Sequence, residues 1–406
     1  MNARAAMPPA VVEGPPPGNS SIARSEPRCA VAHVMLDVGV RSETFVANAI
    51  QAAERQGWES HVVGLKAHGE FDAVPAGRVH CTGTGTLLQR ARTRLTRSTP
   101  ERRFAERALA FVGGQEIGLV HAHFGWSGNY AAPLADMLGV PLVVTFYGSD
   151  ATAPASSYDR LFGQTQRVTA VSEYVGQHLR GLGYEGPVEL IRNGLPLDRL
   201  QSRSTPPGTD DGLRLLYVGR LIPVKGADVL VRAMPTILAA HPAARLDVIG
   251  DGPERAACEA IASNDLNLGD AVSFHGARDH AAVLEAMRAA HVLVVPGRTM
   301  PGGQAETSSM VFKEALALGV PVAATASGAL PETCPPAFRD QLARTDDPSD
   351  LARAVLLSVL DDPGAWAGRA EEGRRWVSEQ FDLTRMGERL SQYYADALRE
   401  HHAASA

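Results

Sequence analysis

Short apolar runs alternate with longer amphipathic segments along almost the whole chain, and this alternation constrains the fold more than any other feature. A first series of apolar runs covers residues 29–36, 59–65, 118–124, 141–147, 167–172 and 187–191, and a second covers 213–219, 244–250, 271–276, 291–297 and 320–326. Helical patterns such as 42–57 and 226–241 lie between them. Because buried strands that alternate with helices form parallel sheets covered on both faces, we predict an α/β fold with two doubly wound, Rossmann-like domains.

The length of 406 residues also fits two domains. We predict a disordered, Pro-rich leader over 1–27, an N-terminal domain over 28–200, a polar linker over 201–212 and a C-terminal domain over 213–384. We expect a final helix over 385–406 that crosses back to the N-terminal domain.

Composition excludes several classes of protein. The leader has no apolar core before a cleavage site, and the longest apolar runs are too short to span a membrane. The chain has four scattered cysteines, namely Cys29, Cys81, Cys258 and Cys334. Their scatter argues against disulfides and a zinc site and fits a reducing cytoplasm. A net charge of −6 does not favour nucleic acid as a partner.

One segment of the N-terminal half is strongly basic. Residues 89–107 hold two glutamates and seven arginines, namely Arg90, Arg92, Arg94, Arg97, Arg102, Arg103 and Arg107. We favour a solvated helix face here. The alternative is a surface for anionic lipid or a phosphorylated acceptor, so at most peripheral membrane contact is expected.

Cationic and glycine residues follow the strands of the C-terminal domain. Arg220 and Lys225 flank a turn that leads into a helix near Ala227, where the helix dipole and free N–H groups would add to the side-chain charge and create an anion site. Two ordinary surface cations are the alternative. Gly276 and Arg278 end another strand, where a nucleobase could lie against exposed backbone.

Two glutamates, Glu306 and Glu314, surround the expected start of a helix. Ser308 or Ser309 would cap this helix, which would end near Gly319. Carboxylates accept from sugar hydroxyls, and the backbone amides of Ser308, Ser309 and Met310 would donate to phosphate oxygens, so this arrangement suits a phosphorylated sugar. A helix cap with one solvated glutamate is the alternative.

These motifs, in this order, resemble the GT4 family of retaining glycosyltransferases, which have the GT-B fold of two Rossmann-like domains facing a central cleft. In the C-terminal domain the resemblance rests on "GRLIPVKG", "GDGP", "FHG", the Glu306–Glu314 spacing and "GVPVAATASGALPE". In the N-terminal domain it rests on "GVRSETFVANAIQAAERQGWESHVVG", "HAHFGWSGNYAAPLA", "PLVVTFYGSD" and "IRNGLPLDRL". It covers roughly residues 30–395.

The resemblance implies roles for individual residues. Arg220 and Lys225 would hold the donor diphosphate, Glu314 the ribose, and Glu306 the donor sugar, together with the amides that follow it. His123 would lie beside the transferred sugar and the acceptor, and Gly39 in the loop facing the phosphates. The expected catalytic set is therefore His123, Arg220, Lys225 and Glu306.

Two positions depart from the family pattern. Tyr147 replaces the usual histidine of T-F-H-G, so this position lacks the imidazole that an acid–base role would use. Thr307 replaces the glycine that usually follows the first glutamate, and its side chain narrows the expected sugar pocket and so bears on the choice of donor.

The expected mechanism uses no metal and no cofactor. No D-x-D sequence occurs that could bridge a metal and a diphosphate, so cations and helix N-termini would stabilise the leaving group. No clear carboxylate nucleophile is found in the N-terminal domain, so we favour same-face substitution, in which the departing phosphate takes the acceptor proton.

The expected substrates are a UDP-sugar, UDP-N-acetylglucosamine or UDP-glucose, and a polar small-molecule acceptor. The acceptor could be an aminocyclitol of an aminoglycoside antibiotic, which would suit the polar residues Asp37, Glu43, Tyr147 and Asp150. Alternatives are a transferase that acts on exopolysaccharide or lipid-linked oligosaccharide, a GT-B enzyme that is not a transferase, or a sugar-nucleotide sensor.

Overall fold

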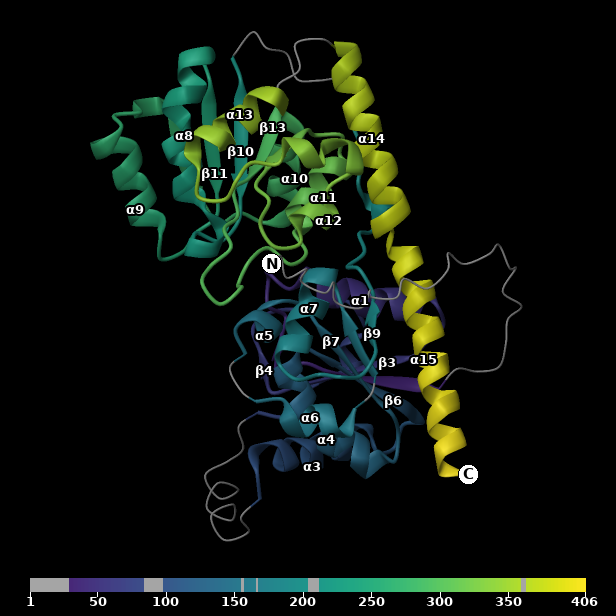
Figure 1. Cartoon of the computed structure of the whole chain (residues 1–406). Helices are drawn as coiled ribbons and strands as arrows, with labels where there is room; N and C mark the ends of the chain where they lie inside the picture. The colour runs from purple at the N-terminus through teal and green to yellow at the C-terminus, as the bar shows by residue number, and fades with distance from the viewer. Residues whose placement is uncertain (1–28, 84–97, 155–156, 166, 204–211, 359–362) are drawn as a thin grey trace, which may run out of the picture. The chain divides into compact units, whose positions relative to one another are not determined.

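The computed structural model describes residues 29–83, 98–154, 157–165, 167–203, 212–358 and 363–406 (Figure 1). The chain forms two compact units: unit 1 comprises Met1–Arg192 and Gly387–Ala406, and unit 2 comprises Asn193–Met386. The expected leader, residues 204–211 of the expected linker and Arg90–Arg97 lie outside the described residues.

Unit 1 is built on a parallel sheet with the strand order β5-β3-β1-β6-β7-β8-β9. These strands are β1 (Ala30–Val34), β3 (Ser60–Gly64), β5 (Val79–Cys81), β6 (Ile117–His123), β7 (Leu142–Phe146), β8 (Arg167–Ala170) and β9 (Val188–Leu190). A separate pair joins β2 (Asp37–Val38) and β4 (Lys66–Ala67). The helices are α1 (Thr44–Arg55), α3 (Pro100–Val112), α4 (Gly125–Leu138), α5 (Ser149–Thr152), α6 (Asp159–Gln164) and α7 (Glu173–Gly181).

The last helix, α15 (Leu383–Ser405), begins in unit 2 and belongs to unit 1 from Gly387 onward. Trp58 Nε1 donates to Ser391 Oγ at 3.0 Å, and the Tyr393 hydroxyl donates to the carbonyl oxygen of Val168 at 3.3 Å. A Cβ on Gly387 would lie 2.8 Å from the carbonyl oxygen of Ala52, so the backbones of α15 and α1 approach closely.

Unit 2 contains a five-stranded parallel sheet with the order β12-β11-β10-β13-β14. The strands are β10 (Arg214–Val218), β11 (Arg245–Ile249), β12 (Val272–Gly276), β13 (Val292–Val295) and β14 (Val322–Ala324). The helices are α8 (Ala227–Ala240), α9 (Arg255–Ala260), α10 (His280–Ala289), α11 (Met310–Ala317), α12 (Leu330–Thr333), α13 (Pro348–Ser358) and α14 (Pro363–Phe381).

Alternate residues of β10 enter different cores of unit 2, which lie on the two faces of its sheet. Leu215 and Tyr217 pack in one core with side chains of α8 and α13. Leu216 packs in another with side chains of α10 and α11. Strands buried on both faces explain why the sequence reads as continuous apolar runs.

All eleven strands predicted from the apolar runs are present, and the predicted fold class is confirmed. The prediction missed β2, β4 and β5. The first two have only two residues each, and Val79–Cys81 is only half-buried, so none of them leaves an apolar run in the sequence.

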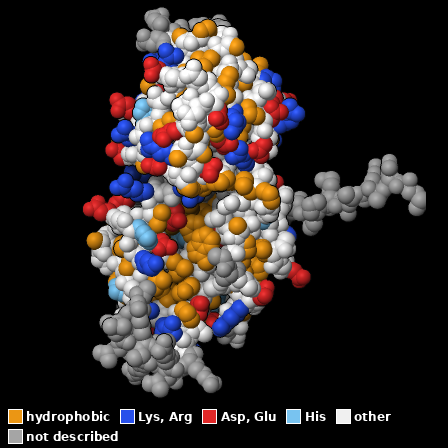
Figure 2. All heavy atoms as spheres, turned by 90° about the vertical axis from the view of Figure 1, so that its left-hand side faces the viewer, with side chains coloured by type: hydrophobic (Ala, Val, Ile, Leu, Met, Phe, Trp, Pro, Cys, Tyr) orange, Lys and Arg blue, Asp and Glu red, His pale blue; other side chains and the backbone are white. Residues whose placement is uncertain are grey.

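The surface carries both signs of charge. Figure 2 shows Lys and Arg side chains mixed with Asp and Glu, and hydrophobic side chains gathered over part of unit 1. In the described part of the basic segment, Arg102 Nε pairs with Glu106 Oε1 at 3.3 Å on α3, as on a solvated helix face. No helix among the described residues is long and apolar enough to cross a membrane.

Candidate active site

In unit 2, the loops that follow β10, β11 and β12 approach one another closely at the carboxyl edge of the sheet. The N–H of Gly219 donates to the carbonyl of Ile249 at 3.0 Å, and the N–H of Gly250 donates to the carbonyl of Gly276 at 2.9 Å. A Cβ on Gly250 would lie 1.8 Å from the carbonyl oxygen of Gly219. Gly250 therefore allows backbone to meet backbone, which accounts for the first glycine of "GDGP".

The turn after β10 places a lysine beside the loop after β13. Pro223–Lys225 form a 3₁₀ turn, and Gly226 follows with φ +65° as the N-cap of α8. A Cβ on Gly226 would lie 2.1 Å from the carbonyl oxygen of Pro296. Only glycine suits both this left-handed conformation and the close approach.

Lys225 and Glu306 meet in this place. Lys225 Nζ lies 2.5 Å from Glu306 Oε1, and the Glu306 side chain is only 5% exposed. The Glu306 carbonyl accepts from the N–H of Ala329 at 2.6 Å, and a Cβ on Gly297 would lie 2.8 Å from Glu306 Cγ. The carboxylate is therefore held in one position, with a cation against it.

The other two cations predicted for this site are exposed. The Arg220 guanidinium forms no ion pair with a described residue, although its backbone carbonyl accepts from the Tyr217 hydroxyl at 3.1 Å. Arg278 is exposed after Gly276, which has φ +70°. Both arginines can therefore meet an anionic ligand.

Glu314 has a histidine partner that the sequence analysis did not predict. His280 Nε2 lies 2.9 Å from Glu314 Oε1, where the Glu314 side chain is 9% exposed and that of His280 is 58% exposed. This hydrogen bond is the largest cause of a raised pKa of His280. His280 is the first residue of α10, which Asp279 caps by accepting from the N–H of Ala282 at 2.8 Å.

The segment between the two glutamates leads into α11 as predicted. Ser309 is the N-cap, although its side chain makes no capping hydrogen bond, and Gly319 has φ +75°. Thr307, Ser308 and Met310 are half-buried. Glu314 is the fifth residue of α11 and lies on the second turn of this helix.

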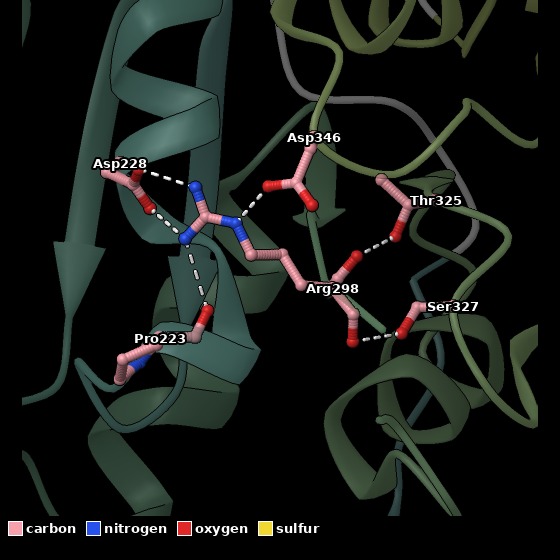
Figure 3. A network of polar contacts seen from close by, with 7 residues as sticks. Pro223, Asp228, Arg298, Thr325, Ser327 and Asp346 are labelled. Carbon is pink, nitrogen blue, oxygen red and sulfur yellow. Dashed lines mark hydrogen bonds and ion pairs between the residues drawn. The ribbon is translucent and has the colours of Figure 1, made fainter. Parts of the chain in front are cut away.

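Arg298 fixes the loops around the Lys225 turn (Figure 3). Its guanidinium donates to both carboxylate oxygens of Asp228 on α8, each at 2.7 Å, and it also pairs with Asp346 and donates to the carbonyl of Pro223 at 3.2 Å. The Arg298 carbonyl accepts from Ser327 Oγ at 2.6 Å. The loop after β13 is therefore fastened to both the lysine turn and the loop after β14.

In unit 1, His123 lies fully buried at the end of β6. His123 Nδ1 is 2.7 Å from the Tyr147 hydroxyl, and His123 Nε2 is 3.0 Å from His33 Nδ1. Burial, followed by the neighbouring histidines His121 and His33, holds the pKa of His123 well below its usual value. Tyr147 therefore contacts His123 directly.

His33, His121 and His123 form the one group among the described residues with a spacing that could hold a metal ion. His121 already contacts the Tyr394 hydroxyl at 2.6 Å and Thr145 Oγ1 at 2.7 Å. Burial lowers the pKa of His121 to about 3. Because the ring nitrogens of His121 and His123 all have hydrogen-bond partners, we interpret this trio as a neutral polar network.

Asp150 uses its carboxylate to fix the backbone beside Tyr147. It accepts from the N–H groups of Gly125 at 2.9 Å, Tyr147 at 3.1 Å and Gly148 at 2.7 Å. Burial raises the pKa of Asp150 to about 6, and the amide hydrogen bonds oppose that shift. Phe124, between His123 and α4, has φ +73°, a strained conformation for an aromatic residue.

The other residues predicted for unit 1 lie in the segment after β1. Asp37 is half exposed and pairs with His68 at 2.7 Å. A Cβ on Gly39, which has φ +78°, would lie 2.5 Å from the carbonyl oxygen of Gly69. Glu43 is half-buried and is the N-cap residue of α1.

The structure thus brings together, within unit 2, Lys225 with Glu306, and within unit 1, His123 with Tyr147. His280, Arg298 and His33 were missed by the sequence analysis. The "FHGARDH" motif ends at His280 and gave a signal for it, whereas the partners of Arg298 and His33 are remote in sequence.

The two parallel-sheet units, one with cations and carboxylates at the carboxyl edge of its sheet, match the GT-B class of glycosyltransferases. Residues 212–361 match the family described as Glycosyl transferases group 1, and residues 42–199 match Glycosyltransferase Family 4. The two matches together cover most of the chain, which belongs to the GT4 family of glycosyltransferases.

Individual proteins agree with this assignment. The chain is 29% identical over 289 residues to a GDP-mannose-dependent monoacylated alpha-(1-6)-phosphatidylinositol monomannoside mannosyltransferase of Corynebacterium glutamicum, covering 66% of this chain and 74% of that one. A sucrose-phosphate synthase from Thermosynechococcus elongatus superimposes with a TM-score of 0.70 at 24% identity, covering 93% and 100%. HepE of Anabaena, solved with UDP and glucose, gives a TM-score of 0.72 at 18% identity, covering 91% and 100%; these two likenesses concern the fold.

Proposed function

We propose that this glycosyltransferase moves a hexose or N-acetylhexosamine from UDP-glucose or UDP-N-acetylglucosamine to a polar small-molecule acceptor, with retention of configuration and without a metal ion. The observation that carries the proposal is the 2.5 Å contact between Lys225 and Glu306, together with the exposed Arg220 on the same loop between β10 and α8. It supplies two cations for a diphosphate and one carboxylate for sugar hydroxyls in a single loop cluster.

The leaving group would be stabilised by fixed charges. As the bond to the sugar breaks, negative charge builds on the nucleoside diphosphate, and Arg220, Lys225 and the N–H groups at the start of α11 would receive it. Glu306 would then accept hydrogen bonds from the donor sugar, and Glu314 from the ribose. In same-face substitution the departing phosphate oxygen takes the proton of the acceptor hydroxyl.

His123 would contribute from unit 1 as a neutral imidazole. Its lowered pKa means that it carries no charge at neutral pH and does not supply a cation. Because Tyr147 and His33 already occupy its two ring nitrogens, a sugar hydroxyl would have to replace one of these partners. The link to Tyr147 would set the orientation of the ring.

For the acceptor, we favour an amine-bearing polyol such as an aminocyclitol of antibiotic biosynthesis. Asp37 and Glu43 would meet its ammonium groups. Asp150 is a weaker candidate because three backbone amides already bind its carboxylate. A lipid-linked or exopolysaccharide acceptor with GDP-mannose as donor is the second candidate, because the Corynebacterium relative is named as a GDP-mannose-dependent enzyme for a phosphatidylinositol mannoside.

A donor-by-acceptor panel tests this proposal. The purified protein is incubated with UDP-glucose, UDP-N-acetylglucosamine or GDP-mannose and with aminocyclitols or lipid-linked saccharides, with and without EDTA. Mass spectrometry identifies products, and NMR gives the anomeric configuration. Transfer to the aminocyclitol, retained configuration and indifference to EDTA support the proposal; product with the lipid acceptor alone selects the second candidate.

Variants of the same cluster connect the activity to the site. Lys225→Met or Arg220→Met should lower turnover by roughly 10²–10³. Arg232→Met, at an exposed arginine on α8 to which no role is assigned, is the matched control and should leave turnover unchanged. Unchanged turnover in both site variants would overturn the assignment.

A further inference from the structure

Lys313, on the first turns of α11, is fully buried, although lysine is rarely buried. The chain contains 39 lysines and arginines, of which only Lys66, Lys225 and Lys313 are lysines. A cation near a helix N-terminus opposes the helix dipole. Both the burial and the position are unfavourable, which suggests that the ammonium serves a purpose other than stability.

The ammonium of Lys313 is aimed at the segment that follows Glu306. Lys313 Nζ donates to Ser308 Oγ at 2.7 Å and to the carbonyl oxygen of Asn193 at 3.2 Å. It also lies 3.9 Å from Met310 Sδ and 4.7 Å from the centre of the Phe381 ring. Lys313 therefore ties the Ser308 side chain to the turn at Asn193, and all of these residues belong to unit 2.

The Ser308 hydroxyl receives a second donor. Asn193 Nδ2 donates to Ser308 Oγ at 3.2 Å, and Asn193 is only 2% exposed. A hydroxyl oxygen has two lone pairs, so these two donors use its whole capacity to accept. Ser308 can then act only as a donor towards any further group.

The opposite orientation of the Asn193 amide is less favourable. As placed, the amide leaves one buried acceptor, Asn193 Oδ1, without a hydrogen-bond partner among the described residues. If the amide were reversed, Asn193 Oδ1 would accept from Ser308. The two N–H groups of the amide would then lie where Oδ1 now lies, without hydrogen-bond partners. Two buried unpaired donors cost more than one unpaired acceptor.

We propose that Lys313 is a positioning residue that holds Ser308 as an obligate hydrogen-bond donor for the terminal phosphate of the nucleoside diphosphate. Ser308 lies two residues after Glu306, whose carboxylate contacts Lys225, and it is half-buried, so its O–H can reach a ligand. A hydroxyl polarised by an ammonium suits an anionic oxygen. This inference rests on the proposed function, because it assumes that the same loops bind a nucleoside diphosphate.

The test compares binding of UDP and UMP by calorimetry, because only UDP has the terminal phosphate; GDP and GMP replace them if the protein prefers guanine. Ser308→Ala should weaken UDP binding about 10-fold and UMP binding less than about 2-fold. Ser308→Thr keeps a hydroxyl and should restore most of the difference. Ser358→Ala is the matched control, because this buried serine donates to the carbonyl of Ala354 at 2.9 Å on α13 and should change neither affinity.

Lys313→Met removes the ammonium and keeps an unbranched apolar chain. It should weaken UDP binding by a similar factor and raise KM for the donor, and adding Ser308→Ala should then cost less than about a further 2-fold. If Lys313→Met does not fold, the comparison of Ser308→Ala with Ser308→Thr, together with Asn193→Asp, tests the inference. Asn193→Asp replaces the Nδ2 donor by an acceptor for the Ser308 proton and should mimic Ser308→Ala.

A Ser308→Ala protein that keeps the wild-type ratio of UDP to UMP affinity overturns the inference, and so does one that loses affinity for a UDP-sugar but not for UDP, because the sugar would then be the partner. Wild-type protein that binds neither diphosphate indicates instead that the proposed function is wrong.

Discussion

His280 Nε2 and Glu314 Oε1 lie 2.9 Å apart, which joins the first residue of α10 to the buried carboxylate of α11. Glu314 is expected to bind the ribose of the donor. A ribose hydroxyl and His280 would therefore compete for, or share, the two oxygens of one carboxylate.

The first prediction concerns the titration of His280. Because its hydrogen bond to Glu314 raises the pKa of His280, Glu314→Gln should return that pKa towards 6.5. The hydrogen bond to Glu314 stabilises the native protein while His280 is protonated, at acid pH. This contribution to the free energy of unfolding is lost as the pH rises through the raised pKa. NMR titration of the imidazole measures the shift; an identical pKa in both proteins would show that Glu314 is not the cause.

The second prediction concerns Arg298, whose side chain is 18% exposed and pairs with Asp228, which is 19% exposed. Arg298→Met leaves that carboxylate without its bidentate partner and should lower the free energy of unfolding by about 3 kcal/mol. Arg344→Met is the control, because its side chain is 79% exposed and its ion pairs should contribute less than about 1 kcal/mol. Denaturant unfolding compares the two, and equal losses would contradict the role given to the Arg298 network.

The third prediction uses two glycines with similar backbone conformations. Gly226 has φ +65° and would place a Cβ 2.1 Å from the carbonyl oxygen of Pro296, whereas Gly57 has φ +83° and nothing within 4 Å. Gly57→Ala should cost only the left-handed strain of about 1–2 kcal/mol. Gly226→Ala should cost more and should also lower turnover, because the Lys225 turn must shift. Thermal unfolding and rate measurements on the two variants test whether close approach, rather than φ alone, requires Gly226.

The fourth prediction concerns acid stability of unit 1. The buried trio of His33, His121 and His123 has lowered pKa values, so the unfolded chain binds protons that the native protein does not. As pH falls below about 6.5, each histidine should reduce the free energy of unfolding by about 1.4 kcal/mol per pH unit. Asp150 has the opposite sign, because its pKa is raised to about 6, and it offsets one histidine between about pH 6 and pH 4.

His33→Leu tests the size of this effect. It removes one of the three titrating groups, so the slope of unfolding free energy against pH should fall by about 1.4 kcal/mol per pH unit. It also leaves His123 Nε2 without its partner, so the variant should be less stable by about 1–3 kcal/mol at neutral pH. An unchanged slope would mean that His33 is not held neutral in the native protein.

Much of the fold could be predicted from sequence because it is encoded locally. Strands such as β10 and β13 are buried on both faces and leave continuous apolar runs, and Gly226 and Gly319 mark turns that need positive φ. The two-residue strands β2 and β4 left no such trace.

Patterns along the sequence were enough to predict the two parallel sheets, the family and the loops that carry Arg220, Lys225, Glu306 and Glu314. Only the folded chain shows which groups meet: Lys225 with Glu306, His280 with Glu314, and Lys313 with the backbone carbonyl of Asn193. The physical reason is distance along the chain. Periodicity and turn chemistry act over a few residues, whereas a contact between residues 34, 81 or 120 positions apart exists only after the sheet has brought their loops to one edge.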